Sequence, residues 1–246
     1  MIADRLAAIQ DRVARAAERS GRTADAVTIV GVSKTFPPEL IRDAWMAGVR
    51  HFGENRVQEA VAKIPAAETL IAAPGQCHWH LVGHLQTNKV KPAIELFELL
   101  HAVDSPRIAD EIDRQAALRE LRVPVLVEVN TSGEVTKHGV TPNGLPRLVD
   151  HVLARPALEL RGLMTVGPNV ASAEEARPAF RLLARLAADE RARLGPGRGS
   201  GAAPAGAGAP DLSILSMGMS DDFEVAVQEG ATMIRIGRAL FGERSP

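Results

Sequence analysis

The sequence predicts a single (β/α)8 barrel, and three observations lead to this fold. Eight short apolar runs, each typical of a buried strand, recur along the 246 residues. Helical patterns separate most of them, as expected of parallel strands joined by crossover helices. The chain also has the usual size of one such barrel, about 250 residues. We therefore expect one domain over residues 1–246.

The eight predicted strands are near-continuous apolar runs, which suit strands covered on both faces. They are residues 27–33, 50–53, 78–82, 99–103, 123–130, 158–164, 212–216 and 232–236. A doubly wound open sheet is the alternative arrangement of such strands. It lacks support, because no Gly-x-Gly-x-x-Gly motif follows the first strand.

Predicted helices lie before the first strand and between the later ones. Ile2, Leu6, Ile9 and Val13 repeat at helical spacing, so residues 2–19 should form an extra amphipathic helix in front of the barrel. The other predicted helices are residues 38–47, 56–64, 88–96, 105–121, 145–153, 173–194 and 221–229.

Residues 195–210 form a low-complexity segment made only of Gly, Ala, Pro, Ser and Arg. They have nothing to bury, so we expect a flexible insertion before the seventh strand rather than a domain boundary. A glycine-rich phosphate cradle is the alternative. No Lys-Ser or Lys-Thr pair and no helix start follows the glycines, which argues against it.

Composition restricts the partners and the compartment. The formal net charge of −1 gives no electrostatic basis for binding nucleic acid or an anionic membrane. No apolar run approaches the roughly 18 residues of a membrane helix, and the first residues do not resemble a signal peptide. The one cysteine, Cys77, excludes an internal disulfide. We expect a cytoplasmic protein without a nucleic-acid or membrane partner.

Lys34 follows the first predicted strand and should lie at the mouth of the barrel. An ammonium group there is costly to desolvate, so it either pairs with a carboxylate or reacts as a neutral amine. A neutral amine can form an imine with a carbonyl compound. Other strands end in Asn55, His84 and Met164, at the edge where barrels of this class carry their chemistry.

The last two strand ends predict a phosphate site. Strand seven ends at Ser216 in Ser-Met-Gly-Met-Ser, and strand eight ends in Ile-Gly237-Arg238 before a short helix. Glycine allows close approach of the backbone, and N–H groups at a helix start donate to anions. Arg235 should point into the barrel mouth; beside a pyridine nitrogen it would disfavour ring protonation, which argues against aminotransferase chemistry.

The run Cys77-His78-Trp79-His80 with His84 raises a zinc hypothesis. In a strand, His78 and His80 share a face while Cys77 points away, and no second cysteine completes a tetrahedral set. We therefore expect no metal site. His84 is predicted to contact the pocket or a neighbouring loop.

Motifs along nearly the whole chain resemble those of the YggS/PROSC family of pyridoxal 5′-phosphate (PLP) binding proteins, also called PLP homeostasis proteins. The motifs are Val-Gly-Val-Ser-Lys34, Phe52-Gly-Glu-Asn55-Arg-Val-Gln-Glu59, Trp79-His-Leu-Val-Gly-His-Leu-Gln-Thr-Asn-Lys89, Glu128-Val-Asn-Thr-Ser, Lys137-His-Gly139, Arg161-Gly-Leu-Met-Thr165, Leu215-Ser-Met-Gly-Met-Ser-Asp-Asp222 and Arg235-Ile-Gly-Arg-Ala-Leu-Phe-Gly242. The insertion at 195–210 is the clear departure. The resemblance implies a barrel of PLP fold type III, related to the N-terminal barrel of alanine racemase.

The resemblance also implies roles for individual residues. Lys34 would carry PLP as an internal Schiff base. The phosphate would be held by Ser216, Gly237 and the backbone of Arg238. Arg235 would face the pyridine nitrogen, with Asn55 near the ring and Met164 at its face. His84 and Lys137 are further candidates for the pocket.

The family implies a non-catalytic PLP carrier or buffer in vitamin B6 homeostasis, acting as a monomer and able to supply PLP-dependent apo-enzymes. The alternative is a PLP-dependent racemase or lyase of small amino acids. A racemase that resembles alanine racemase needs a tyrosine opposite the lysine, and this chain has none; His84 or Lys137 would have to replace it. A Schiff-base aldolase acting on a sugar phosphate is a third reading, with Glu54 as its acid or base.

Overall fold

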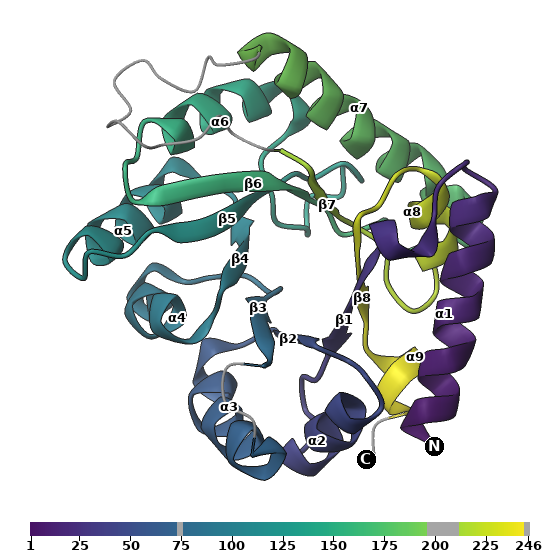
Figure 1. The fold of residues 1–246 in the computed structure, drawn as a ribbon. Helices are drawn as coiled ribbons and strands as arrows, with labels where there is room; N and C mark the ends of the chain where they lie inside the picture. Colours follow the sequence, from purple (N-terminus) through teal and green to yellow (C-terminus); the bar gives the residue numbers. More distant parts are fainter. Residues whose placement is uncertain (73–75, 196–211, 244–246) are drawn as a thin grey trace.

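The eight strands form a closed parallel barrel with helices around its outside (Figure 1). The computed structural model describes residues 1–72, 76–195 and 212–243. Each strand pairs with the next along the chain, and β1 pairs with β8 to close the sheet. The predicted (β/α)8 barrel is therefore confirmed, and the open doubly wound sheet is excluded because the described sheet has no edge.

All eight predicted strands are present, most of them a residue or two shorter than expected. They are β1 (Thr28–Val32), β2 (His51–Glu54), β3 (His78–Leu81), β4 (Leu99–Val103), β5 (Val123–Glu128), β6 (Leu158–Met164), β7 (Ile214–Ser216) and β8 (Met233–Ile236). Their carboxyl ends meet on one face of the barrel, where the residues singled out from the sequence gather.

The helices cover the outer face of the barrel (Figure 1). They are α1 (Ile2–Glu18), α2 (Pro38–Met46), α3 (Val57–Ile71), α4 (Val90–Leu96), α5 (Pro106–Ala117), α6 (Leu145–Leu153), α7 (Arg177–Leu194), α8 (Phe223–Gln228) and α9 (Arg238–Phe241). The predicted N-terminal helix is α1, which packs against α8 and α9. Leu6, Ile9 and Val13 are buried on its inner face, as their spacing predicts.

Helix α3 differs from its prediction, because it continues through Pro65 instead of ending at residue 64. A proline inside a helix removes one backbone hydrogen bond, and its ring clashes with the preceding turn, so it normally kinks or ends the helix. Ala67 and Ile71 are nevertheless buried beyond it. Their packing against the barrel continues the apolar face of α3, so tertiary contact overrides the local effect of the proline.

Apolar side chains pack both between barrel and helices and inside the barrel. The inner cluster consists of Val30, Leu99, Leu126, Met164 and Met233. Residues 1–72, 76–195 and 212–243 contain no helix that is both long and apolar enough to span a bilayer. The predicted insertion at 195–210 lies, apart from Gly195, outside the described residues.

Candidate functional site

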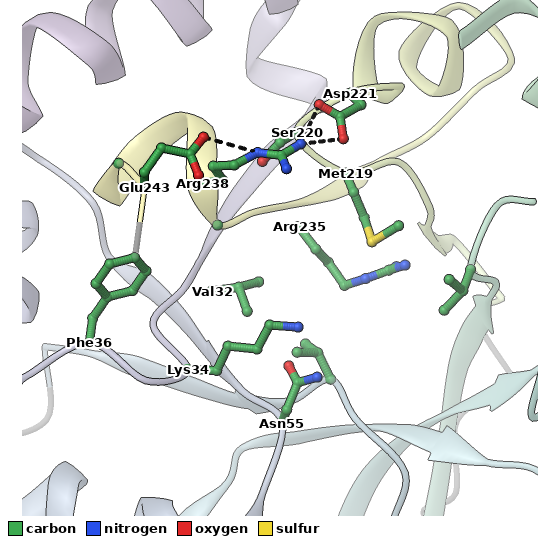
Figure 2. A pocket seen from close by; sticks show the side chains of 14 residues that line it. Val32, Lys34, Phe36, Asn55, Met219, Ser220, Asp221, Arg235, Arg238 and Glu243 are labelled. Atoms are coloured by element: carbon green, nitrogen blue, oxygen red, sulfur yellow. Dashed lines mark hydrogen bonds and ion pairs between the residues drawn. The ribbon is translucent and has the colours of Figure 1, made fainter. Parts of the chain in front are cut away.

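A cavity of about 490 Å³ opens at the carboxyl ends of β1, β2 and β8. Five residues predicted from the sequence line it: Lys34, Asn55, Arg235, Gly237 and Arg238. Figure 2 shows the Lys34 side chain extending into the cavity from the β1 end, with Arg235 across from it and Asn55 beside it. The structure therefore brings together residues that are more than two hundred positions apart in the chain.

The backbone around Lys34 is held in an uncommon conformation. Thr35 has φ 67°, in the left-handed region that residues with a branched side chain rarely adopt. Its N–H donates to Glu59 Oε1 over 2.7 Å, and Lys63 Nζ donates to the carbonyl of Ser33 over 2.9 Å. Two side chains of α3 thus fix the residues on either side of Lys34.

A buried ion pair holds the two α3 side chains, Lys63 and Glu59, in place. Lys63 Nζ lies 3.0 Å from Glu54 Oε1 and 2.5 Å from Glu59 Oε1, and Glu54 is fully buried. The hydroxyl of Ser33 also donates to Glu54 Oε1, over 2.7 Å. Burial raises the pKa of the Glu54 carboxyl, while Ser33 and Lys63 oppose that rise. Glu54 therefore supports the residues next to Lys34, through Ser33 and Lys63, and does not itself line the cavity.

The end of β3 lies unusually close to Asn55. A Cβ atom added to Gly83 would lie 2.5 Å from the carbonyl oxygen of Asn55 and 2.8 Å from its Cα. Only glycine permits this approach of the two strand ends. Gly83 therefore allows the second and third strand ends to meet, with Asn55 directed to the cavity.

Arg235 lies in the barrel interior, 4% exposed, and is held by the neighbouring strand ends. Its guanidinium donates to the carbonyl and the hydroxyl of Ser216, each over 2.8 Å, and to the carbonyl of Thr165 over 2.8 Å. Burial lowers its pKa to about 10, and the carboxylates of Asp222 and Glu128 oppose that shift. Arg235 remains charged at neutral pH and presents only donors to the cavity.

A chain of hydrogen bonds runs from Arg235 through the barrel. The Ser216 hydroxyl lies 3.0 Å from His101 Nδ1, His101 Nε2 lies 3.0 Å from His80 Nδ1, and His80 Nε2 lies 3.0 Å from His51 Nδ1. Ser216 and His101 are fully buried and His80 is 3% exposed. We call these residues, with Arg235, the histidine relay.

The donor at one end sets the direction of every hydrogen bond in the relay. Arg235 donates to the Ser216 hydroxyl, whose own proton has His101 Nδ1 as its acceptor among the described contacts. A buried hydroxyl proton without an acceptor would be costly. His101 and His80 are then both neutral and carry their proton on Nε2, each donating to the next Nδ1.

This arrangement predicts that His80 and His101 resist protonation in acid. Burial lowers the pKa of His80 to about 3 and that of His101 well below its usual range. Because these pKa values fall on folding, each histidine contributes stability that is present above about pH 6.5 and is lost as the pH falls toward the folded pKa. In ¹⁵N NMR of histidine-labelled protein at pH 5.5, both rings should be neutral with the proton on Nε2. An imidazolium signal from either ring would contradict the relay.

The end of the cavity for which the sequence predicts a phosphate site is formed by the turn after β7 and the start of α9. Gly218, at φ 93°, reverses the chain, and a Cβ there would lie 2.5 Å from the Cβ of Ala226. The turn brings Ser220 to the cavity wall, where its hydroxyl accepts the N–H of Ala239 over 3.2 Å. Gly237 lies at the N-cap of α9, where backbone N–H groups lack partners within the helix.

The side chain of Arg238 points away from this backbone. It donates to both carboxylate oxygens of Asp221, at 2.5 and 2.7 Å, and lies 3.7 Å from Glu243 (Figure 2). The Arg238 side chain is therefore engaged by these two carboxylates, and the phosphate role predicted for its backbone stays a prediction.

Ser216 and Met164 are not among the residues lining the cavity. Ser216 belongs to the histidine relay, and Met164 is 1% exposed within the inner apolar cluster. Both are the last residues of their strands, and both are buried. Ser220, which the sequence did not single out, occupies the wall position expected of Ser216.

His84 and Lys137 also lie away from this cavity. His84 lines two adjoining hollows, one of which shares Asn55 with the cavity. Lys137 pairs with Glu134 at 3.1 Å and donates to the carbonyl of Gly167. Neither side chain lines the cavity that holds Lys34 and Arg235.

Glu128, at the end of β5, adds a titratable group beside the relay. The pKa of its carboxyl is raised to about 7, mainly by burial and also by Asp104, while Arg235 opposes the rise. The sequence pattern had placed Glu128 within a buried strand without a role. Its charge near neutral pH depends on Arg235, so the two residues share one electrostatic environment.

The lining residues fit a phosphorylated aldehyde with an aromatic ring. An amine stands at one wall, an arginine at the opposite wall, and backbone donors with a serine hydroxyl at the anion end. A Cβ placed on Gly237 would meet only Val32, at 3.5 and 3.8 Å, which is ordinary contact distance. The amine can form an imine with the PLP aldehyde, the arginine can donate to the ring nitrogen, and the remaining donors can bind the phosphate.

Comparison with known proteins agrees with this geometry. Residues 5–245 match the family model described as alanine racemase, N-terminal domain. A pyridoxal phosphate homeostasis protein of Aquifex aeolicus is 42% identical over 241 residues, covering 98% of this chain and 97% of that protein.

Two solved structures extend the comparison. PipY of Synechococcus elongatus, with PLP bound, has a TM-score of 0.79 and 33% identity, and covers 98% of this chain and 100% of its own. Alanine racemase of Clostridium difficile has a TM-score of 0.67 at 16% identity, over 96% of this chain and 56% of its own. The second likeness concerns the fold alone, which is that of the racemase barrel.

Proposed function

Because the chain belongs to the family of pyridoxal phosphate homeostasis proteins, we propose that it binds PLP and takes part in intracellular PLP homeostasis. The observation that carries this proposal is the cavity in which Lys34 and the backbone of Gly237 face a common space. PipY, a relative that matches along nearly the whole of both chains, has PLP bound in its solved structure.

Each wall of the cavity has a role in this proposal. Lys34 holds the PLP aldehyde carbon as a Schiff base. Arg235 donates toward the pyridine nitrogen and keeps it unprotonated, because a fixed positive charge disfavours a second one nearby. The phosphate accepts from Ser220 and from the backbone of Gly237 and Arg238.

Asn55 lies beside the ring in this proposal, and Ser216 and Met164 act from beneath it. Ser216 fixes Arg235 through its hydroxyl and carbonyl. Met164 supports the floor as part of the inner apolar cluster. The phosphate contact predicted for Ser216 is thus assigned to Ser220.

We favour a non-catalytic carrier or buffer over an enzyme. The relatives' names describe homeostasis rather than a reaction. Among the described lining residues, the acidic groups are Asp221 and Glu243, and both are partners of Arg238. With no tyrosine in the chain, no acid or base of the racemase kind stands opposite Lys34.

The racemase or lyase alternative is tested by exchange of the α-hydrogen. The PLP-loaded protein is incubated in D₂O with a panel of L-amino acids, and deuterium incorporation is followed by NMR. The carrier proposal expects no exchange beyond that of free PLP. Rapid exchange that Lys34→Ala abolishes would establish an enzyme instead.

The aldolase reading loses its proposed acid or base, since Glu54 is buried and paired with Lys63. A direct test adds borohydride to the purified protein with either PLP or a sugar phosphate. PLP should be fixed to the protein with loss of its yellow colour, and the sugar phosphate should not be trapped. Trapping of the sugar phosphate alone would support the aldolase.

Gly237→Ala tests the phosphate end. The added methyl group meets no protein atom closer than 3.5 Å, so the fold should be retained. It would, however, fill the space in front of the donors, and PLP affinity should fall by roughly tenfold or more, equivalent to at least about 1.4 kcal/mol. Titration followed by absorbance measures the loss, with circular dichroism as the control for folding. Unchanged affinity would move the phosphate elsewhere.

Three further parts of the proposal concern the protein's surroundings. We propose that it acts in the cytoplasm, as a monomer, and that it delivers PLP to PLP-dependent apo-enzymes. The single buried cysteine suits a reducing compartment. Sedimentation of the purified chain tests the monomer, and activation of an apo-enzyme by the loaded protein under dialysis tests delivery.

A further inference from the structure

Three side chains outside the PLP cavity converge at the same face of the barrel. His84 follows β3, Asp104 follows β4, and His138 lies in the segment after β5. Each offers a possible ligand atom, and these atoms lie within 4.8 Å of one another. From this geometry we propose a second site, which binds one divalent ion of the zinc type through His84, Asp104 and His138.

The chemistry of the three groups selects this class of ion. Two imidazoles and one carboxylate are ligands that Zn²⁺ and Co²⁺ accept, whereas Mg²⁺ and Ca²⁺ require oxygen. Three protein ligands leave a fourth position for water. In a tetrahedral site with bonds of about 2.1 Å, ligand atoms are roughly 3.4 Å apart, so binding must draw the three groups inward.

The surroundings allow that movement. His84 Nδ1 already lies 3.3 Å from Asp104 Oδ2, and the rings of His84 and His138 stack with centroids 4.1 Å apart. His138 is exposed, so its ring can turn from the stacked position toward the carboxylate. The three residues line a hollow of about 610 Å³ that opens to solvent.

The segment that carries His138 is ordered by its own contacts. Asn130 Nδ2 donates to the carbonyl of Glu134 over 2.9 Å, and Asn130 Oδ1 accepts the N–H of Gly133 over 3.0 Å. The imidazole is thus presented by a defined turn. An ion at the site would tie this turn to the ends of β3 and β4, beside the hollow that connects to Asn55.

From the sequence we predicted no metal site, because the potential ligands near His84 along the chain are poorly placed. The two groups that reach His84 are Asp104, which follows β4, and His138, which lies in the segment after β5. The same three residues, without an ion, would form an ordinary charged cluster of one carboxylate and two imidazoles. The two possibilities differ in whether an added ion binds.

Titration with Co²⁺, followed by its visible absorption, separates them. The untagged full-length chain carrying Lys34→Ala is used after dialysis against PLP-free buffer, so that PLP cannot chelate the ion and the outcome does not depend on the PLP proposal. We expect one equivalent of Co²⁺ with the strong bands of tetrahedral coordination, displaced by Zn²⁺. Absence of these bands would overturn the proposal.

Variants assign the ligands. His138→Gln and Asp104→Asn should each weaken Co²⁺ binding at least tenfold, while circular dichroism shows the fold retained. The matched control is His151→Gln, which removes another imidazole paired with one aspartate, Asp110; it should bind Co²⁺ as the parent does. Parent-like binding by His138→Gln and Asp104→Asn would also overturn the proposal.

Discussion

Lys34→Ala should abolish the yellow colour of the protein and weaken its binding of PLP by roughly 100-fold, which corresponds to about 2.7 kcal/mol. The reason is that no other amine lines the described part of the cavity on the wall facing Arg235. Phosphate and ring contacts would remain, so weak, colourless binding should persist. Absorbance titration and equilibrium dialysis measure the two effects separately.

Lys91→Ala provides the matched control for this experiment. Lys91 is an exposed lysine on α4 that does not line the cavity, and its removal lowers the lysine count equally. The variant should bind PLP with the affinity and colour of the parent. Retained colour in Lys34→Ala, or lost colour in Lys91→Ala, would contradict the assignment of the amine.

Lys63→Met should lower the free energy of unfolding by about 3–5 kcal/mol at pH 8, the range for breaking a buried ion pair. The substitution leaves the fully buried carboxylate of Glu54 without its cation and removes the donor to the Ser33 carbonyl. Because Ser33, next to Lys34, loses this hydrogen bond, Lys34 should be held less firmly and PLP affinity should fall as well. Urea denaturation and PLP titration provide the two measurements.

The double variant Glu54→Gln/Lys63→Met separates the buried charge from lost packing. It removes the carboxylate together with its partner, so it should be more stable than Lys63→Met alone at pH 8. Arg114→Met, which breaks the surface pair with Glu111, is the exposed control and should leave the unfolding midpoint unchanged. Equal stability of the single and double variants would show that charge burial is not the cause.

The fold could be predicted because buried parallel strands are nearly continuous apolar runs. Strand 99–103 was predicted with the bounds that β4 has, since all five of its residues are buried. The ends of the strands were predicted less accurately, as shown by β5, which stops at Glu128, two residues earlier than expected. Helix α3 continues past its predicted end at residue 64, because the burial of Ile71 depends on tertiary packing that the local sequence does not show.

Residues of the cavity were predictable where they directly follow a strand. Lys34, Asn55 and Gly237 were found in this way, and all three line the cavity. Which serine of the turn after β7 reaches the wall was not predictable, because the answer depends on the reversal at Gly218. Ser220 lines the cavity, whereas Ser216 is buried and does not.

The supporting residues were missed for a different reason. In the sequence, Lys63 and Glu59 look like an ordinary surface pair on a helix, four residues apart. Only the packing of α3 directs them toward the residues on either side of Lys34. His101 did carry a signal: a histidine surrounded by apolar residues in a strand. Its partners His80 and Ser216 come from other strands, so the relay required the closed barrel to be seen.

Borohydride reduction of the PLP-loaded protein, followed by peptide mass spectrometry, tests the central claim most directly. The account predicts a stoichiometric pyridoxyl group on the peptide that contains Lys34, and none on that peptide when Lys34 is replaced by alanine. A pyridoxyl group found instead on Lys63, Lys137 or another amine of the parent protein would contradict it.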